Sequence, residues 1–154
     1  MLGNMEAEST INPGIWQNLD QGNYNGGFGL VQWTPATKYF DWCEENNLSP
    51  TDIDANLKRI IYEVENGLQW IPTAAHGMTF RAFTQSTAAV GTLAKAFLLN
   101  YERPEDQSAE VQAYRAELAE YWYSFLKDAN ITPSINRKRK RKYKFVLFGK
   151  KQWR

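Results

Sequence analysis

Apolar residues recur at helical spacing in several stretches of the chain, and turn-forming residues separate these stretches. The clearest stretch follows Ser49-Pro50-Thr51-Asp52, which is a helix start signal, and it ends at Gly67. Its apolar positions predict a helix whose inward stripe is Ile53, Leu57, Ile60, Ile61 and Val64. Similar patterns predict further helices at residues 34–46, 79–85, 88–101 and 108–127.

Each of the longer predicted helices has one apolar face. For residues 34–46 this face is Tyr39, Phe40 and Cys43, with Thr34 as N-cap and Pro35 as first helical residue. For residues 88–101, which Pro104 follows, it is Val90, Leu93, Ala94, Phe97 and Leu98. For residues 108–127 the face is Val111, Tyr114, Leu118, Tyr121, Trp122 and Phe125.

The first 33 residues follow a different pattern. Residues 1–9 are predicted to be the end of a helix, which Asn12-Pro13-Gly14 stops. Residues 15–33 alternate turn residues with aromatic and β-branched residues, and Asn25-Gly26 is a strong hairpin signal. The sequence therefore predicts an α+β fold that is mainly α, with one small β-hairpin.

The composition indicates a single domain that is rich in flat side chains. A length of 154 residues is typical of one domain, and six Trp and eight Tyr exceed what its core needs. Trp and Tyr combine a large apolar body with a polar group, which suits them to bind flat ligands such as sugar rings. Although the net charge is only +1, residues 137–144 are almost entirely basic. We therefore expect a domain at 1–130 and a basic C-terminal tail at 131–154 that binds polyanions weakly.

Several function classes are not expected from this chain. Cys43 is the single cysteine, so neither an intrachain disulfide nor a cysteine zinc site can form. His76 is the single histidine and lies beside Gly77, where nothing supports a Ser-His-Asp triad. No metal or cofactor is expected, and no recognition fold accompanies the basic run to suggest specific nucleic-acid binding. We see neither a signal peptide nor an apolar run of the length, about 20 residues, that a membrane span needs.

Glu8 is the candidate for acid chemistry. It lies where a helix gives way to a loop, and Ser9 and Thr10 follow it as residues that could orient its carboxyl group. A partly buried glutamic acid against apolar surface has a raised pKa, which a glycosidase needs in its general acid. Glu6 is a rival, although its position on the helix directs it to another side. On spacing alone, a lone Glu near a helix end is more often a solvated surface residue.

Three ordered motifs add weight to this interpretation: GNMEAESTINPG at 3–14, GFGLVQW at 27–33 and YERP at 101–104, and the segment 117–123 also matches in position. Over residues 1–127 the chain resembles the lysozyme-like domain of phage tail proteins, in particular the tail-knob lysozymes of short-tailed phages of Gram-positive bacteria. The resemblance implies a lysozyme-like fold, with the hairpin beside an active-site cleft. It also implies cleavage of the β-1,4 bond between N-acetylmuramic acid and N-acetylglucosamine in peptidoglycan.

The resemblance also assigns residues. It implies Glu8 as the general acid, and it places Tyr101 and Glu102 beside or beneath the site. It implies that the sugar strand contacts Ser9, Gly29, Leu30, Gln32, Trp33 and Tyr101. Asp20 is a candidate second carboxylate, with capping of its own turn as an equal alternative. A structural role for Glu102, paired with Arg103 or with a helix end, is the alternative.

The resemblance also suggests a setting for the protein. The protein would act on the bacterial wall from the virion tail or within the host cell, during entry or in lysis. Other tail proteins are possible partners, and residues 137–144 could bind anionic wall polymers by charge. Related domains usually have one more helix before the first motif, so we expect that an upstream helix is missing here. The alternative to an enzyme is a wall-binding or tail structural module without activity.

Overall fold

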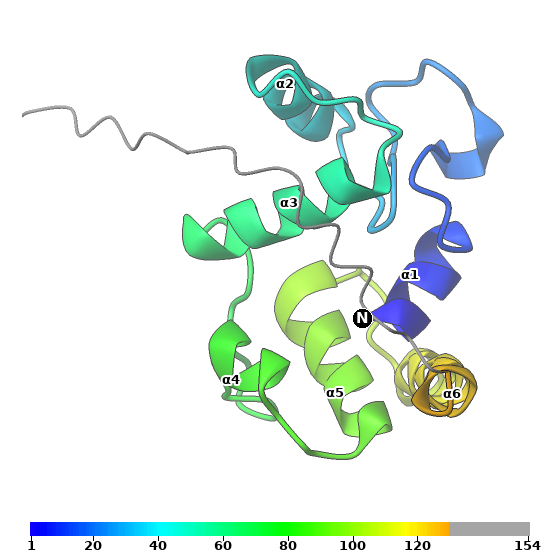
Figure 1. Cartoon of the computed structure of the whole chain (residues 1–154), viewed down its shortest axis with the longest axis vertical. Coiled ribbons are helices and arrows are strands. Elements are labelled where there is room, and N and C mark those ends of the chain that lie inside the picture. The colour runs from blue at the N-terminus through cyan, green and yellow to red at the C-terminus, as the bar shows by residue number, and fades with distance from the viewer. Residues whose placement is uncertain (130–154) are drawn as a thin grey trace, which may run out of the picture.

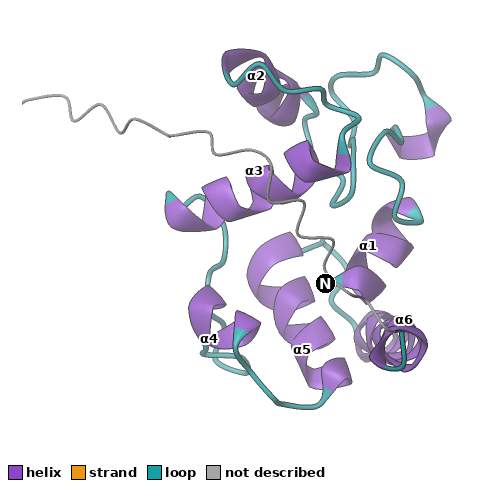
Figure 2. Cartoon of the chain, in the orientation of Figure 1, coloured by secondary structure: helices purple, strands orange, loops and turns teal. Residues whose placement is uncertain are grey.

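Helices form nearly all of the regular structure in residues 1–129, which are the residues that the computed structural model describes (Figure 1). Loops connect them, as Figure 2 shows. In chain order the elements are α1 (Leu2–Ser9), the short 3₁₀ turn η1 (Gln17–Leu19), α2 (Thr37–Glu45), α3 (Ile53–Glu65), α4 (Phe80–Thr84), α5 (Val90–Phe97), the π-helical turn η2 (Leu98–Glu102) and α6 (Ala109–Lys127). None of the helices described is long and apolar enough to span a membrane.

The predicted helix starts are confirmed for three helices. Asp52 caps α3, Thr79 caps α4 and Ser108 caps α6, each by accepting a hydrogen bond from a backbone N–H of the first turn. The start of α2 differs from the prediction. Thr34 donates its hydroxyl to Gln32 O at 2.9 Å, the Thr34-Pro35 peptide is cis, and the helix begins at Thr37.

The inward face of α3 was predicted wrongly. Of the predicted stripe only Ile60 is fully buried, while Ile53, Leu57 and Ile61 are exposed. The buried face instead carries Ala55, Asn56, Arg59, Ile60 and Glu63. This helix therefore turns polar and charged groups into the domain, where they must find hydrogen-bond partners.

Helix α6 packs against α1 and α5, so the short first helix is supported from one side (Figure 1). Gly3 allows this close approach, because a Cβ at that position would lie 2.5 Å from Ala119 N. The predicted apolar face of α6 is only partly confirmed. Tyr114, Tyr121 and Phe125 are exposed, and the buried residues of α6 are Arg115 and Ala119.

Residues 15–33 do not form a two-stranded hairpin. Trp16 pairs with Phe28 and Phe28 with Trp33 only through isolated antiparallel bridges. The tight turn lies at residues 29–32 rather than at Asn25-Gly26, because Phe28 and Trp33 exchange both backbone hydrogen bonds at 3.2 and 3.0 Å. Left-handed residues on both sides of these bridges, including Leu19 and Gln32, prevent longer extended pairing.

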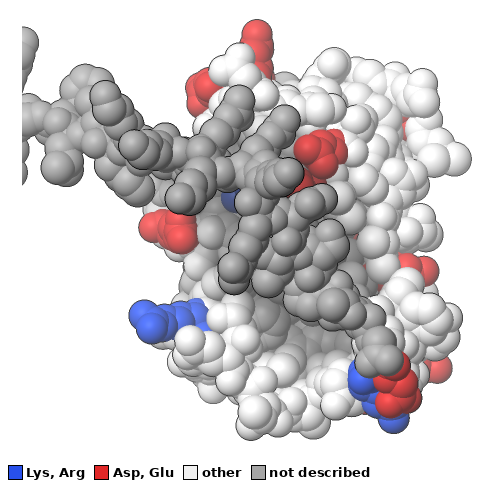
Figure 3. All heavy atoms as spheres, in the orientation of Figure 1, with Lys and Arg blue, Asp and Glu red and all other residues white. Residues whose placement is uncertain are grey.

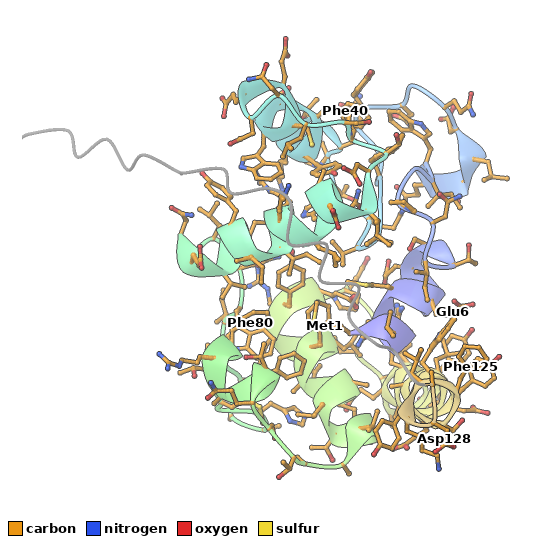
Figure 4. All side chains as sticks on the ribbon, in the orientation of Figure 1. Met1, Glu6, Phe40, Phe80, Phe125 and Asp128 are labelled. Carbon is orange, nitrogen blue, oxygen red and sulfur yellow. The ribbon has the colours of Figure 1, made fainter. Side chains whose placement is uncertain are left out.

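Aromatic side chains fill two parts of the core. One group lies between α2 and the 15–33 loop, where Trp33 stacks on Tyr39 at 4.3 Å and Trp16 stacks on Phe40 at 5.3 Å. The other surrounds Trp70 beneath α4. Figure 4 shows Phe40 in the upper part of the molecule and Phe80 lower down, beside α4, one in each group. Most of the aromatic excess is therefore structural.

Candidate functional site

Glu8, in the last turn of α1, lies at the border between two surface hollows. The larger hollow, here called the cleft, has a volume of about 790 Å³. The smaller, the side hollow, has about 330 Å³ and is formed mainly by residues 15–19. Glu8, Gln17 and Gln32 line both. A long ligand could therefore pass across Glu8 from one hollow into the other.

The carboxylate of Glu8 forms an ion pair with Arg115 of α6. Oε1 of Glu8 accepts from Nη2 of Arg115, and Nη1 of Arg115 donates to Asn4 O at 2.8 Å. Arg115, rather than Ser9 or Thr10, therefore orients Glu8. The Ser9 hydroxyl is buried and contacts Met5 O at 2.8 Å and Leu30 O at 3.1 Å, so it ties α1 to the 29–32 turn.

Glu102 ends the π-helical turn η2 and lines the same cleft. Both of its carboxyl oxygens are buried, and neither meets a hydrogen-bond donor from residues 1–129. Burial, and after it the charge of Glu8, raises the pKa of Glu102 to about 8 despite the opposing effects of Arg115 and the Met1 amino group. The alternative pairing with Arg103 is not observed, because Arg103 Nη2 donates to Gln69 Oε1 at 3.0 Å.

A third carboxylate, Glu63 of α3, holds the floor of the cleft together. Its Oε2 accepts from Trp33 Nε1 at 3.1 Å and from the Tyr101 hydroxyl at 2.5 Å, and its Oε1 accepts from Arg59 Nε at 2.9 Å. Burial, followed by the charge of Glu63, raises the pKa of Tyr101 well above its usual value, so this hydroxyl remains a donor. Trp33 and Tyr101 thus line the cleft with their polar atoms already bound.

The 29–32 turn is fixed from below by Asn56 of α3. Asn56 Oδ1 accepts from Leu30 N at 2.9 Å, and Asn56 Nδ2 donates to the Tyr39 hydroxyl at 2.8 Å. Gly29 has a φ of +81°, and a Cβ there would lie 2.6 Å from Asn56 Oδ1. Of the predicted sugar-wall residues, Gln32 and Trp33 therefore line the cleft, whereas Gly29 and the fully buried Leu30 shape the turn that presents them.

Asp20 lies apart from this group of residues. It is exposed, lines neither hollow, and accepts a hydrogen bond from Asn23 Nδ2 at 3.0 Å. This contact is the turn-capping role that the sequence left open. The structure therefore brings together Glu8, Gln32, Trp33, Tyr101 and Glu102, but it does not bring Asp20 to them.

The sequence patterns did not identify three charged residues that form ion pairs at the site: Arg59, Glu63 and Arg115. Arg59 and Glu63 are four residues apart on one helix, which is the spacing of an ion pair, but that spacing is common on solvated faces. Arg115 lies within a helix whose aromatic residues dominate the pattern. Neither signal distinguishes a buried charge from a surface charge.

The cleft mixes charges of both signs with neutral amides. Lys38, Arg59 and Arg103 line it together with Glu8, Glu63, Glu102 and Glu105, and Gln17, Gln32 and Gln69 add amide groups. On the face drawn in Figure 3, red and blue side chains are likewise scattered rather than gathered into one field. Such a lining suits a polar ligand that is recognised by hydrogen bonds more than by charge.

Comparisons with known proteins identify the family of the chain. The sequence matches the family model described as phage tail lysozyme over residues 1–126. Morphogenesis protein 1 of Bacillus phage B103 is 55% identical over 126 residues, which are 82% of this chain and 33% of that relative. The chain therefore spans about a third of the length of this curated relative.

Proposed function

Because the chain belongs to the phage tail lysozyme family, we propose that it is a peptidoglycan hydrolase of the muramidase or transglycosylase type. Its target is the β-1,4 bond between N-acetylmuramic acid and N-acetylglucosamine. It digests the bacterial wall locally for a phage tail during entry, or acts in lysis. The tail-associated, lysozyme-like role follows from the family, while the catalysis and the bond are our proposal.

The position of Glu8 is the observation that carries this proposal. A polymer must cross the catalytic acid, with sugars on both sides of the bond that breaks. Glu8 stands between the cleft and the side hollow, and the amides of Gln17 and Gln32 border both. These amides both donate and accept hydrogen bonds, as sugar hydroxyl and acetamide groups require. We therefore assign Glu8 as the general acid and the two hollows as the binding sites for the flanking sugars.

The setting of the reaction is proposed on the same basis. The B103 relative is named a morphogenesis protein, which supports an association with the virion. Other tail proteins and the glycan strands are the partners we propose. Residues 137–144, for which we predict charge-based binding to anionic wall polymers, lie outside the described residues.

One observation favours the alternative of a module that binds the wall without cleaving it. Oε1 of Glu8 accepts from Nη2 of Arg115, so this oxygen faces a cation instead of a leaving oxygen. A general acid must present a proton to the leaving oxygen.

The test is the release of muropeptides from purified Gram-positive peptidoglycan, analysed by mass spectrometry. The wild-type chain is compared with Glu8→Gln, and Glu6→Gln, two residues earlier on α1 and outside both hollows, is the matched control. We expect products from the wild type and the control only. Reducing ends would indicate hydrolysis, and anhydro-muramic ends would indicate lytic cleavage. If the wild type binds peptidoglycan but releases nothing, the non-catalytic alternative is the better one.

A further inference from the structure

Two carboxyl groups and one guanidinium act on one another at the cleft. Glu8 comes from α1, Glu102 from η2 and Arg115 from α6. Helix α6 packs against α1 (Figure 1), and Glu8 and Glu102 both line the cleft. Arg115 gives its Nη2 donor to Glu8. Its Nε, like both oxygens of Glu102, is buried without a hydrogen-bond partner among residues 1–129.

In this cluster one guanidinium faces two carboxyl groups, and both oxygens of the Glu102 carboxyl group are buried. Two interacting carboxyl groups hold one proton between them over a wide pH range, and the proton belongs to the pair. In the arrangement observed, the guanidinium of Arg115 is the partner of Glu8. Glu102 has no polar partner within the described residues, and its buried position favours the neutral acid.

We propose that Glu102 is a positioning residue that holds the proton that Glu8 must donate. When this proton moves, Arg115 leaves the carboxylate of Glu8 and pairs with the carboxylate of Glu102. The proposal rests on the proposed glycosidase function. When a sugar strand displaces Arg115 from Glu8, the proton passes from the Glu102 carboxyl group to the Glu8 carboxylate. Glu102 is then the charged carboxylate, and it forms the ion pair with the guanidinium of Arg115. The cluster keeps the same number of protons and the same net charge, and Glu8 becomes a neutral acid beside the leaving oxygen.

The other charged and titratable groups near Glu102 do not provide this proton. The amino group of Met1, on α1, faces Glu102, and burial lowers the pKa of that amino group. Tyr101, its neighbour in η2, keeps its hydroxyl donated to Glu63 of α3. Glu8 and Arg115 are the remaining charges that act on Glu102. Of these groups, only Glu102 is a carboxylic acid whose raised pKa keeps it neutral near pH 7 and that also lines the cleft.

The substitution Glu102→Gln separates this role from a structural one. A Gln side chain has the shape of the neutral carboxylic acid and forms hydrogen bonds, but it can neither release a proton nor become negative. If Glu102 were only a neutral space-filling group, the variant would behave as the wild type does. In the variant, Glu8 alone would have to hold the proton against the charge of Arg115.

The activity of the wild type and Glu102→Gln is measured from pH 4 to pH 9 as the rate of muropeptide release, with Glu117→Gln, an exposed residue of α6, as control. An ordinary glutamic acid with a pKa of about 4.3 is protonated in only about 1 in 500 molecules at pH 7. Circular dichroism at pH 7 first checks that Glu102→Gln is folded. We then expect the variant to lose about 100-fold or more of its rate at pH 7. We expect its rate to recover toward the wild-type value at pH 5, while Glu117→Gln follows the wild type throughout. An unshifted pH profile in Glu102→Gln would overturn the inference.

A second measurement requires neither activity nor a variant. Carboxyl carbon shifts of the glutamates are followed by NMR through a pH titration of the full chain. We expect the Glu102 signal to titrate near pH 8, with a response of the Glu8 and Arg115 signals in the same step. A Glu102 signal that titrates in the ordinary range would overturn the inference, whatever the activity. A wild-type chain that releases no muropeptides would instead remove the proposed function, and the role of Glu102 in it. Cleavage with a wild-type pH profile in Glu102→Gln would remove this inference alone.

Discussion

Replacement of Glu63 by Gln should weaken the whole domain, because one buried carboxylate binds three donors. Trp33 and Tyr101 donate to one of its oxygens, and Arg59 donates to the other. An amide has a single acceptor oxygen, so its NH₂ group must face a donor whichever way it turns. If the NH₂ faces Arg59, a residue that is 7% exposed, the guanidinium loses its acceptor as well as its counter-charge. Breaking one side of a buried ion pair costs about 3–5 kcal/mol.

The alternative orientation is hardly better. With the NH₂ toward Trp33 and Tyr101, two buried donors lose their acceptor, and each unsatisfied group costs about 1–3 kcal/mol. The two orientations thus lead to a similar sum, and we expect the free energy of unfolding to fall by about 3–5 kcal/mol.

Urea unfolding followed by circular dichroism measures this loss. Glu65→Gln is the matched control, since Glu65 is exposed on the same helix and the change in charge is the same. We expect this control to stay within about 0.5 kcal/mol of the wild type, as is usual for exposed positions. A loss below about 1 kcal/mol in Glu63→Gln, at the level of one ordinary hydrogen bond, would refute the three-donor reasoning.

Three further results are expected. Gly29→Ala should lower the free energy of unfolding by about 2–4 kcal/mol in the same assay, because a left-handed alanine is strained and its Cβ would press on Asn56 Oδ1. Asp20→Asn should change muropeptide release by no more than about twofold, because Asp20 is exposed and lines neither hollow. A loss as large as that in Glu8→Gln would restore Asp20 as a catalytic candidate. Glu102→Met should gain stability over the wild type by about 1.4 kcal/mol per pH unit between pH 5 and pH 8. In that window the unfolded wild type releases the Glu102 proton while the folded wild type retains it, so folding of the wild type is increasingly opposed as the pH rises toward about 8, and a gain that does not change with pH would contradict this.

Local signals in the sequence were sufficient for most of the fold. Capping residues such as Asp52 and Ser108 act within one turn of the helix that they begin, so a sequence pattern can identify them. The hairpin prediction was wrong because the contact that decides the turn is not local in the sequence. Asn25-Gly26 is a strong turn signal, but the backbone pairs across the 29–32 turn because Asn56, 26 residues beyond Leu30, binds the Leu30 N–H. No local pattern contains that contact.

The same limit explains the error on α3. A periodicity argument assumes that apolar residues face inward, and on this helix it selected Leu57 and Ile61, which are exposed. Arg59 and Glu63 face inward instead, because Trp33 and Tyr101 supply donors for Glu63 from distant parts of the chain. The motifs found Glu8 and the segment that contains Glu102, yet they could not show that Arg115, 107 residues after Glu8, binds its carboxylate.

The location of the buried polar groups bears on whether the domain is built to catalyse or only to bind. A buried charge weakens a fold unless it is paired, and a pair is often no better than apolar packing of the same volume. Among the described residues, the buried carboxyl and guanidinium groups are those of Arg59, Glu63, Glu102 and Arg115, and each lines the cleft or binds a residue that does. Perturbed ionisable groups that gather at one cleft are typical of catalytic sites, where proton affinity must be set. A surface that only holds a glycan strand needs aromatic faces and hydrogen-bonding amides, and it has no use for an acid kept neutral against its natural pKa. The presence of Glu102 near Glu8 and Arg115, at a cost in stability, therefore supports the proposed proton transfer to a leaving group over binding alone.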